Sequence, residues 1–215
     1  MTHAGIFHVV GCGRFGQQAA MRLGAIRGAE LVLVDADPER ARRVASHARA
    51  ARIQAGDGIT HVEDLLRRPG TGDIWIIPTL PVHLAAEVLI RLTRWNRKSL
   101  SALRALPDLP GRTAGTTGDV YSTLADFVCP PDCPGPEGKT CVHTGAKRDR
   151  HLHEMLEGLV LHSRQLAPGV GGYTVSALQA LKKRMDEEPA DTLWVSTASC
   201  CHGVTTLLGA ATDSS

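Results

Sequence analysis

The chain of 215 residues has few aromatic residues, little net charge and no long apolar run. Aromatic side chains make up only 4% of it, so the core must be built from aliphatic residues. The apolar runs stay far below the roughly 18 residues that a membrane-spanning helix needs. The formal net charge of +2 argues against a nucleic-acid-coating or membrane-surface protein. The first residues lack the pattern of a secretory signal, so we expect a cytoplasmic protein.

The remaining composition is that of a folded globular domain. Hydrophobic residues account for 43% and charged residues for 21%, which excludes a disordered, collagen-like or coiled-coil chain. The 22 glycines and six cysteines are unevenly distributed. In a reducing compartment, clustered cysteines more often bind metal or carry out redox chemistry than form disulfides.

Short apolar runs alternate with helical segments over the first hundred residues. We expect strands at 6–10, 31–34, 52–55 and 73–77, and helices at 17–23, 39–49, 60–67 and 82–92. Because the strands are continuously apolar, they indicate a parallel sheet that is covered on both faces. The expected fold is therefore an α/β, doubly wound, mostly parallel, Rossmann-like sheet with a cysteine-rich insertion.

Three regions follow from this pattern. Residues 1–98 form the N-terminal Rossmann half, residues 99–150 a Pro/Gly/Cys-rich insertion, and residues 151–215 the strands and helices that complete the same sheet. Within the last region we expect a helix at 173–185 after a glycine-rich turn, and a short helix at the end of the chain. The turn could hold an anion at the helix N-terminus, or serve only as a crossover.

A glycine motif, Gly11-x-Gly13-x-x-Gly16, lies between the first expected strand and helix. The first glycine permits a tight turn, the second lets the backbone approach a pyrophosphate, and the third allows close packing of helix and strand. Asp35 ends the second expected strand. An acid at this position accepts hydrogen bonds from the ribose hydroxyls and repels a 2′-phosphate. The motif predicts NAD(H) rather than NADP(H). The alternatives are a turn without a ligand and a site for another adenosine compound.

Three segments resemble the nucleotide-binding domains that regulate potassium conductance (RCK type). They are Gly11-Cys12-Gly13-Arg14-Phe15-Gly16, Val34-Asp35-Ala36-Asp37 and Gly56-Asp57. The resemblance covers about residues 5–78 and implies a pocket for NAD or ATP. The residues that it assigns to this pocket are Gly11, Gly13, Arg14, Phe15, Gly16, Asp35 and Asp57.

A second resemblance concerns residues 73–87, which are similar to the fourth strand and following turn of small-sugar and amino-acid dehydrogenases. Those proteins place a proline-containing turn and a histidine beside the nicotinamide ribose. The resemblance makes His83 a candidate neighbour of the cofactor. The alternative is a surface histidine in the first turn of a helix.

A proline-rich loop carries Cys129, Cys133, Cys141 and His143 with the spacing C-x3-C-x7-C-x-H. Thiolates are soft ligands that suit zinc or iron–sulfur clusters. A polar, turn-rich loop cannot bury a core of its own, and a bound metal would stabilise it. The spacing is neither that of a zinc ribbon nor that of a bacterial ferredoxin.

Cys200 and Cys201 follow the expected strand at 192–196, and ligands gather at the carboxyl ends of such strands. The cysteine loop could fold over the same edge. The metal ligands that we predict, for an iron–sulfur cluster or zinc, are Cys129, Cys133, Cys141, Cys200 and Cys201. Free cysteines and a disulfide are the alternatives. Cys12 is interpreted as a small buried filler.

These features give a first hypothesis, an NAD(H)-binding redox protein or NAD-dependent oxidoreductase with a cysteine-ligated metal. It would act with a redox partner protein, and a homodimer is compatible with the fold. The alternative is an RCK-like regulatory nucleotide sensor with a structural metal and no catalysis. The sequence assigns no catalytic residue.

Overall fold

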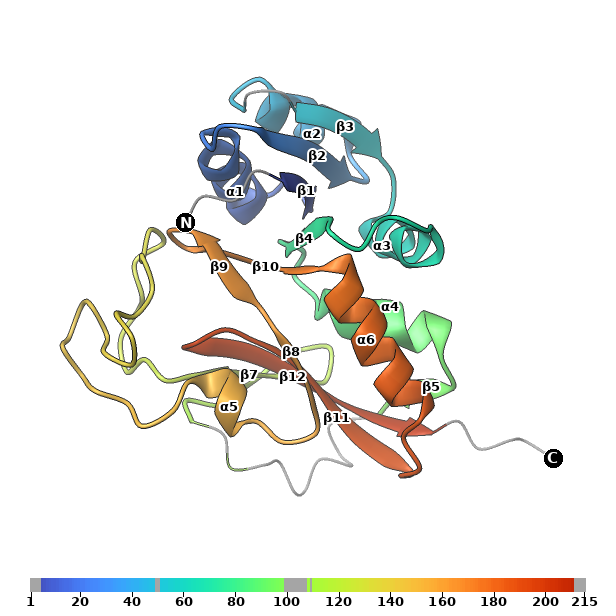
Figure 1. Ribbon diagram of the computed structural model, residues 1–215, viewed down its shortest axis with the longest axis vertical. Helices are drawn as coiled ribbons and strands as arrows, with labels where there is room; N and C mark the ends of the chain where they lie inside the picture. The colour runs from blue at the N-terminus through green and yellow to red at the C-terminus, as the bar shows by residue number, and fades with distance from the viewer. Residues whose placement is uncertain (1–4, 49–50, 99–107, 109, 211–215) are drawn as a thin grey trace.

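The computed structural model describes residues 5–48, 51–98, 108 and 110–210. The first part of the expected insertion, residues 99–107 and 109, lies outside this range, as does the end of the helix expected at 39–49. Within the described part, two sheets are stacked with helices between and around them (Figure 1).

The first sheet has the strand order β3-β2-β1-β4-β10-β9. Its strands are β1 (Gly5–Val10), β2 (Ala29–Asp35), β3 (Ala51–Ala55), β4 (Trp75–Pro78), β9 (Arg164–Ala167) and β10 (Val170–Thr174). The four N-terminal strands run parallel, whereas β10 pairs antiparallel with β4 and β9 antiparallel with β10. Segments from the two ends of the chain therefore share this sheet.

Helices cover both faces of the first sheet. They are α1 (Arg14–Gly24), α2 (Pro38–Ala45), α3 (Gly58–Arg67), α4 (Leu84–Leu92) and α6 (Val175–Asp186). Side chains of α1 and α2 pack on one face, and side chains of α3, α4 and α6 on the other. The starts of three helices are encoded locally, because Asp37, Asp57 and Thr174 accept hydrogen bonds from backbone N–H groups of the first turn.

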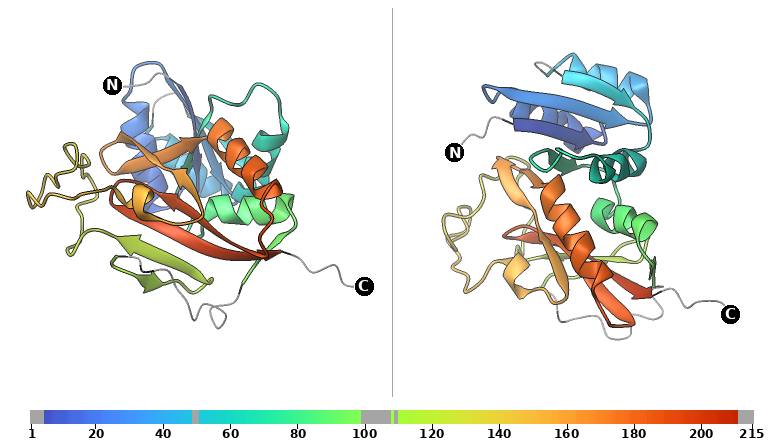
Figure 2. Two further views of the ribbon diagram at one scale, coloured as in Figure 1. Left: turned by 60° about the horizontal axis from the view of Figure 1, so that its bottom comes forward. Right: turned by 45° about the vertical axis from the view of Figure 1, so that its right-hand side comes forward.

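The second sheet has the order β6-β7-β12-β11-β8, with β5 paired to β12. Its strands are β5 (Trp95–Arg97), β6 (Thr113–Ala114), β7 (Asp119–Thr123), β8 (Leu159–His162), β11 (Thr192–Ala198) and β12 (His202–Ala210), and the short helix α5 (Leu152–Met155) packs beside it. In the right-hand view of Figure 2 the first sheet lies above the second, with α4 and α6 between them. A large apolar core fills this space, and the fully buried Trp95 belongs to it.

The Rossmann-like α/β fold with parallel strands is confirmed, and two local expectations were wrong. The glycine turn expected before a helix is the tip of the β9–β10 hairpin, and the expected final helix is β12. The residues Val204, Thr205 and Thr206 favour a strand, and β12 pairs with β11 along its whole length. Residues 151–215 extend the first sheet only through β9 and β10, because β8, β11 and β12 belong to the second sheet.

Candidate functional site

The glycine motif forms a tight connection between β1 and α1. Gly11 has a φ of +105°, which favours glycine, and its N–H donates to the carbonyl of Val34 at 2.8 Å. A Cβ on Gly16 would overlap the carbonyl oxygen of Gly11, so only glycine permits this close packing. A Cβ on Gly13 would meet no heavy atom within 4 Å. The second glycine therefore faces open space, as a position approached by a phosphate should.

Asp35 lies beside this loop, as the motif requires. Its carboxylate accepts hydrogen bonds from the N–H groups of Cys12, at 2.6 Å, and Asp37, at 2.8 Å. Arg40 lies 3.7 Å from the same carboxylate, which is 7% exposed. Asp35 thus fixes the glycine loop and the turn after β2 together, in addition to any contact that it makes with a ribose.

The other residues assigned by the RCK resemblance lie on the same edge. Arg14 and Phe15 are exposed in the first turn of α1, and Phe15 has 63% of its surface accessible. Asp57 caps α3 through the N–H and hydroxyl of Thr60, both at 2.8 Å. These hydrogen bonds, with the backbone bond largest, lower the pKa of Asp57. Its demonstrated contacts are therefore structural.

Hydrogen bonds connect the cysteine loop to the N-terminal half of the molecule. Gln18 and Arg22 of α1 donate hydrogen bonds to the carbonyl of Pro131, the latter at 2.7 Å. The carbonyl of Cys133 accepts from Gly169 N–H at 2.8 Å and from the Gln165 side chain at 2.7 Å. The loop consequently lies against α1 and the β9–β10 hairpin.

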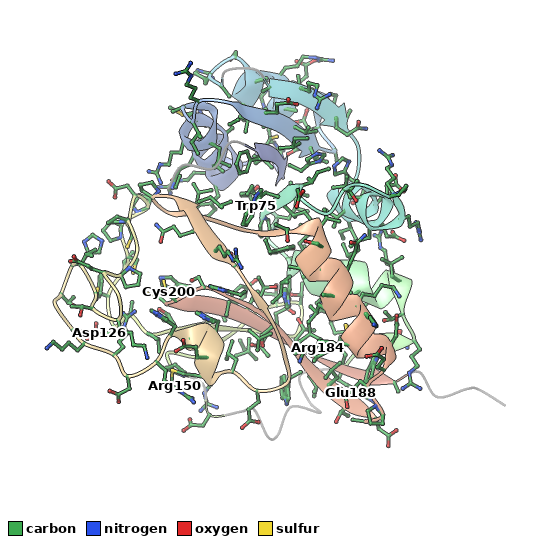
Figure 3. The ribbon with its side chains drawn as sticks, in the orientation of Figure 1. Trp75, Asp126, Arg150, Arg184, Glu188 and Cys200 are labelled. Carbon is green, nitrogen blue, oxygen red and sulfur yellow. The ribbon has the colours of Figure 1, made fainter. Side chains whose placement is uncertain are left out.

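A cavity of about 460 Å³ lies between the loop and the sheets. Its wall contains Phe15 and Gln18 from the glycine-loop side, and Thr197 from the end of β11. All five cysteines predicted as metal ligands also line it, namely Cys129, Cys133, Cys141, Cys200 and Cys201. Figure 3 shows Cys200 at the end of the β11–β12 hairpin, next to the loop. The tertiary structure thus gathers thiols from two distant segments beside the glycine loop.

The thiols of this cavity differ in their electrostatics. The Sγ atoms of Cys200 and Cys201 lie 3.4 Å apart, and Arg148 donates to Cys201 Sγ at 2.7 Å. The hydrogen bond with Cys200 and the Arg148 guanidinium lower the pKa of Cys201 to about 5. Burial and the neighbouring cysteines raise the pKa of Cys129. Cys12 lies apart in the core, 3% exposed, and burial raises its pKa to about 11, which agrees with a filler role.

The cysteines surround the cavity without converging on one point. Among the residues that the structure describes, no group of three or more His, Cys, Asp or Glu side chains is arranged to hold a metal ion. His143 contacts the Phe127 ring and does not line the cavity. His151, just before α5, and His153 of α5 stack with each other outside it.

His83 is buried, so the alternative of a surface histidine was wrong, and its place beside a cofactor stays a prediction. Its Nε2 lies 2.9 Å from the Thr197 hydroxyl and its Nδ1 2.7 Å from the Thr206 hydroxyl. Thr206 donates its only hydroxyl proton to Asp119, at 2.5 Å, and must therefore accept from His83 Nδ1–H. His83 Nε2 then accepts a hydrogen bond from the hydroxyl of Thr197, and Thr197 is one of the residues that line the cavity. Burial lowers the pKa of His83 to about 4.

Several residues of the site were missed by the sequence reasoning. Thr79, after β4, donates a hydrogen bond from its hydroxyl to the Gly11 carbonyl at 2.6 Å and so connects β4 to the glycine loop. Arg148 and Thr197 approach the cavity only because the chain folds over itself. A threonine or arginine in isolation carries no sequence signal for such a position. Only Gln18, one helical turn after Phe15, could have been found from its helical spacing.

The buried His83 predicts a pH-dependent stability. Its pKa is about 4 in the folded protein and 6.5 ordinarily, so between these values the unfolded chain binds a proton that the folded chain does not. Stability should fall as the pH drops from 6.5 towards 4, with His83 contributing roughly 1.4 kcal/mol per pH unit. Urea unfolding of the His83→Gln variant should show a correspondingly shallower decline. His47→Gln, at an exposed position, is the control. An unchanged slope in His83→Gln would contradict the assignment.

Comparisons with known proteins divide the chain at α4. Residues 7–92 match the TrkA-N domain family, an RCK-type Rossmann-like domain, and such domains generally bind NAD(H). Residues 84–211 match the family AF_1314_C, described as "Uncharacterized protein, C-terminal domain". No helix in the described part is long and apolar enough to cross a membrane.

One relative spans nearly the whole molecule. It is a protein of Archaeoglobus fulgidus, described as uncharacterized, which is 31% identical over 218 residues that cover 93% of this chain and 97% of the relative. No solved structure matches the chain. The chain therefore belongs to the AF_1314_C family, with a TrkA-N domain forming its N-terminal part.

Proposed function

We propose that the protein binds NAD(H) across its glycine loop and works as a redox protein, an NAD-dependent oxidoreductase or a component of one. The cysteine-lined cavity would be its second redox site. The observation that carries the proposal is a single cavity whose wall contains both Phe15 of the glycine loop and all five candidate cysteines. A dinucleotide bound on the loop would place one end at the thiols.

Five features support the dinucleotide. The N-terminus of α1 has no side-chain cap, so its N–H groups remain free for phosphates. Gly13 leaves room for them, and no acidic residue occupies the first turn of α1. Asp35 stands at the position of the ribose-binding acid. The TrkA-N match supports the same ligand class.

The donor set supports a thiolate-ligated metal in its chemistry. The charges of Cys133, Cys141 and Cys201 act on Cys129, and Arg148 favours the thiolate form of Cys201. Thiolates suit zinc and iron–sulfur clusters alike, and the redox proposal requires the cluster because zinc has no redox chemistry. Such a cluster, when bound, supplies one-electron transfer.

Hydrogen bonds within the protein would hold the cysteine loop in position beside the cavity. Gln18 and Arg22 hold the cysteine loop against α1, and Gln165 holds it against β9. The prolines of the loop limit its conformations. His83 accepts a hydrogen bond from Thr197 and so fixes the position of this wall residue.

The second candidate function is regulatory. The TrkA-N domain favours a nucleotide sensor that acts on a partner protein without catalysis. The metal would then be structural and colourless zinc would suffice. The two candidates differ in metal content and in electron transfer from NADH.

Gly13→Ala tests the phosphate site with little damage to the fold. Its added Cβ meets no protein atom within 4 Å, so the melting temperature should fall by no more than about 4 °C. The methyl group would occupy phosphate space, and calorimetry should show NADH affinity reduced at least about tenfold. Ala19→Gly, deep in α1, serves as a control that alters the helix but not the loop. Undiminished NADH affinity in Gly13→Ala would place the dinucleotide elsewhere.

Asp35→Ala separates ribose recognition from loop support. Loss of the hydrogen bonds from Cys12 N–H and Asp37 N–H to Asp35 should lower the affinities for NADH and NADPH equally. Loss of ribose recognition should instead change the ratio of the two affinities. We expect NADH affinity to fall several-fold and the preference over NADPH to shrink, because the repelling carboxylate is gone. Parallel titrations with both nucleotides measure this. A lower affinity with an unchanged ratio would reduce Asp35 to a structural role.

The metal prediction is tested on protein purified without oxygen. We expect iron and inorganic sulfide, with visible absorbance that dithionite bleaches. Cys133→Ser should lose most of this absorbance and part of the thermal stability. Cys12→Ser, the same substitution outside the cavity, should retain it. Stoichiometric zinc would favour the regulatory candidate, and protein free of both metals would refute the metal centre.

A further inference from the structure

A second cavity, of about 280 Å³, lies on the other side of the β9–β10 hairpin. Its wall is formed by β4, β8, β10 and α6, and Figure 3 shows Trp75 and Arg184 on two of these elements. Along the β8–β9 connection the residues alternate between the cavities. His162 and Arg164 line the smaller one, and Ser163 and Gln165 the larger. The two cavities are therefore separate spaces that share a wall.

An unpartnered hydroxyl marks this smaller cavity. Tyr173 is 1% exposed, lines the cavity, and has no hydrogen-bond partner for its buried hydroxyl. Buried polar groups in native proteins are nearly always hydrogen-bonded, because an unpaired one costs free energy. A ligand that accepts from this hydroxyl would remove that cost.

Positive charge lies at the mouth of the same cavity. Arg164 and Arg184 both line it and are exposed, and within the described residues no carboxylate pairs with either. In other helices, arginines pair with carboxylates, as Arg67 does with Glu63 at 2.8 Å. Two free guanidiniums beside one cavity favour an anionic group, which they can bind by paired hydrogen bonds.

Most of the rest of the wall is apolar, and its polar members are His162 and Thr174. The apolar members include Trp75, Leu161, Ala177 and Leu181. Typical small-molecule sites have volumes of about 300–1,000 Å³. This cavity is near the lower end of that range, so it suits a small ligand and not a dinucleotide. We propose that this cavity binds a small organic acid, with a carboxylate or phosphate at Arg164 and Arg184 and an apolar body against Trp75 and Leu181. The inference does not depend on the proposed NAD(H) site.

The test uses the full chain and four probes, namely benzoate, phenylphosphate, inorganic phosphate and benzyl alcohol. Titrations followed by NMR should show saturable binding of benzoate or phenylphosphate, with shifts at the Trp75 indole N–H and at Ala177. The better of the two identifies the acid group. Phosphate, which lacks the apolar body, and benzyl alcohol, which lacks the charge, should bind at least about tenfold more weakly.

Variants separate a ligand site from a structural irregularity. Arg184→Ala should weaken the preferred probe about tenfold, whereas Lys183→Ala removes the same charge from an exposed neighbour and should not. Tyr173→Phe should leave the melting temperature of the free protein equal or higher, yet weaken probe binding several-fold.

NADH affinity should stay unchanged in these variants, so failure of this proposal is distinct from failure of the dinucleotide site. The proposal is overturned if neither acid binds saturably, if benzyl alcohol binds equally well, or if Arg184→Ala binds as the parent does.

Discussion

The pairing of β10 with β4 is the contact on which the rest of the arrangement depends. It adds a C-terminal strand, running antiparallel, to the edge of a parallel N-terminal sheet. The approach is close, since a Cβ on Gly172 would lie 2.7 Å from the carbonyl oxygen of Ile76. Glycine at this position therefore permits the two parts of the chain to share one sheet.

This pairing positions the β9–β10 hairpin as a wall between two cavities. One side of the hairpin receives the cysteine loop, through Gln165 and Gly169, and so brings the thiols to the glycine loop. The other side faces α6 and the unpaired guanidiniums of Arg164 and Arg184. The same ribbon thus separates an environment of thiols from one of positive charge.

A buried polar chain ties the second sheet to the first domain. Asp119 of β7, Thr206 of β12 and His83 at the start of α4 are linked by hydrogen bonds that end at Thr197. Arg97 compensates the Asp119 charge, and its other nitrogen reaches Glu87 of α4 at 2.6 Å. Asp119, Thr206 and His83 each have hydrogen-bond partners within this network, which makes the relative placement of β7, β12 and α4 specific. Burial of the network also explains why the pKa of His83 is low.

The sequence by itself determined the local features of this protein. Continuous apolar runs predicted β1, β2 and β4, the motif Gly11–Gly16 predicted the turn into α1, and Asp35 was expected beside it. Contacts between distant segments were decided only by the tertiary structure. The glycines at 169–172 could equally precede a helix, and the pairing with β4 decided for a hairpin. The thiols of the loop and of the β11–β12 turn meet for the same reason, because convergence of separated segments depends on packing that no local pattern records.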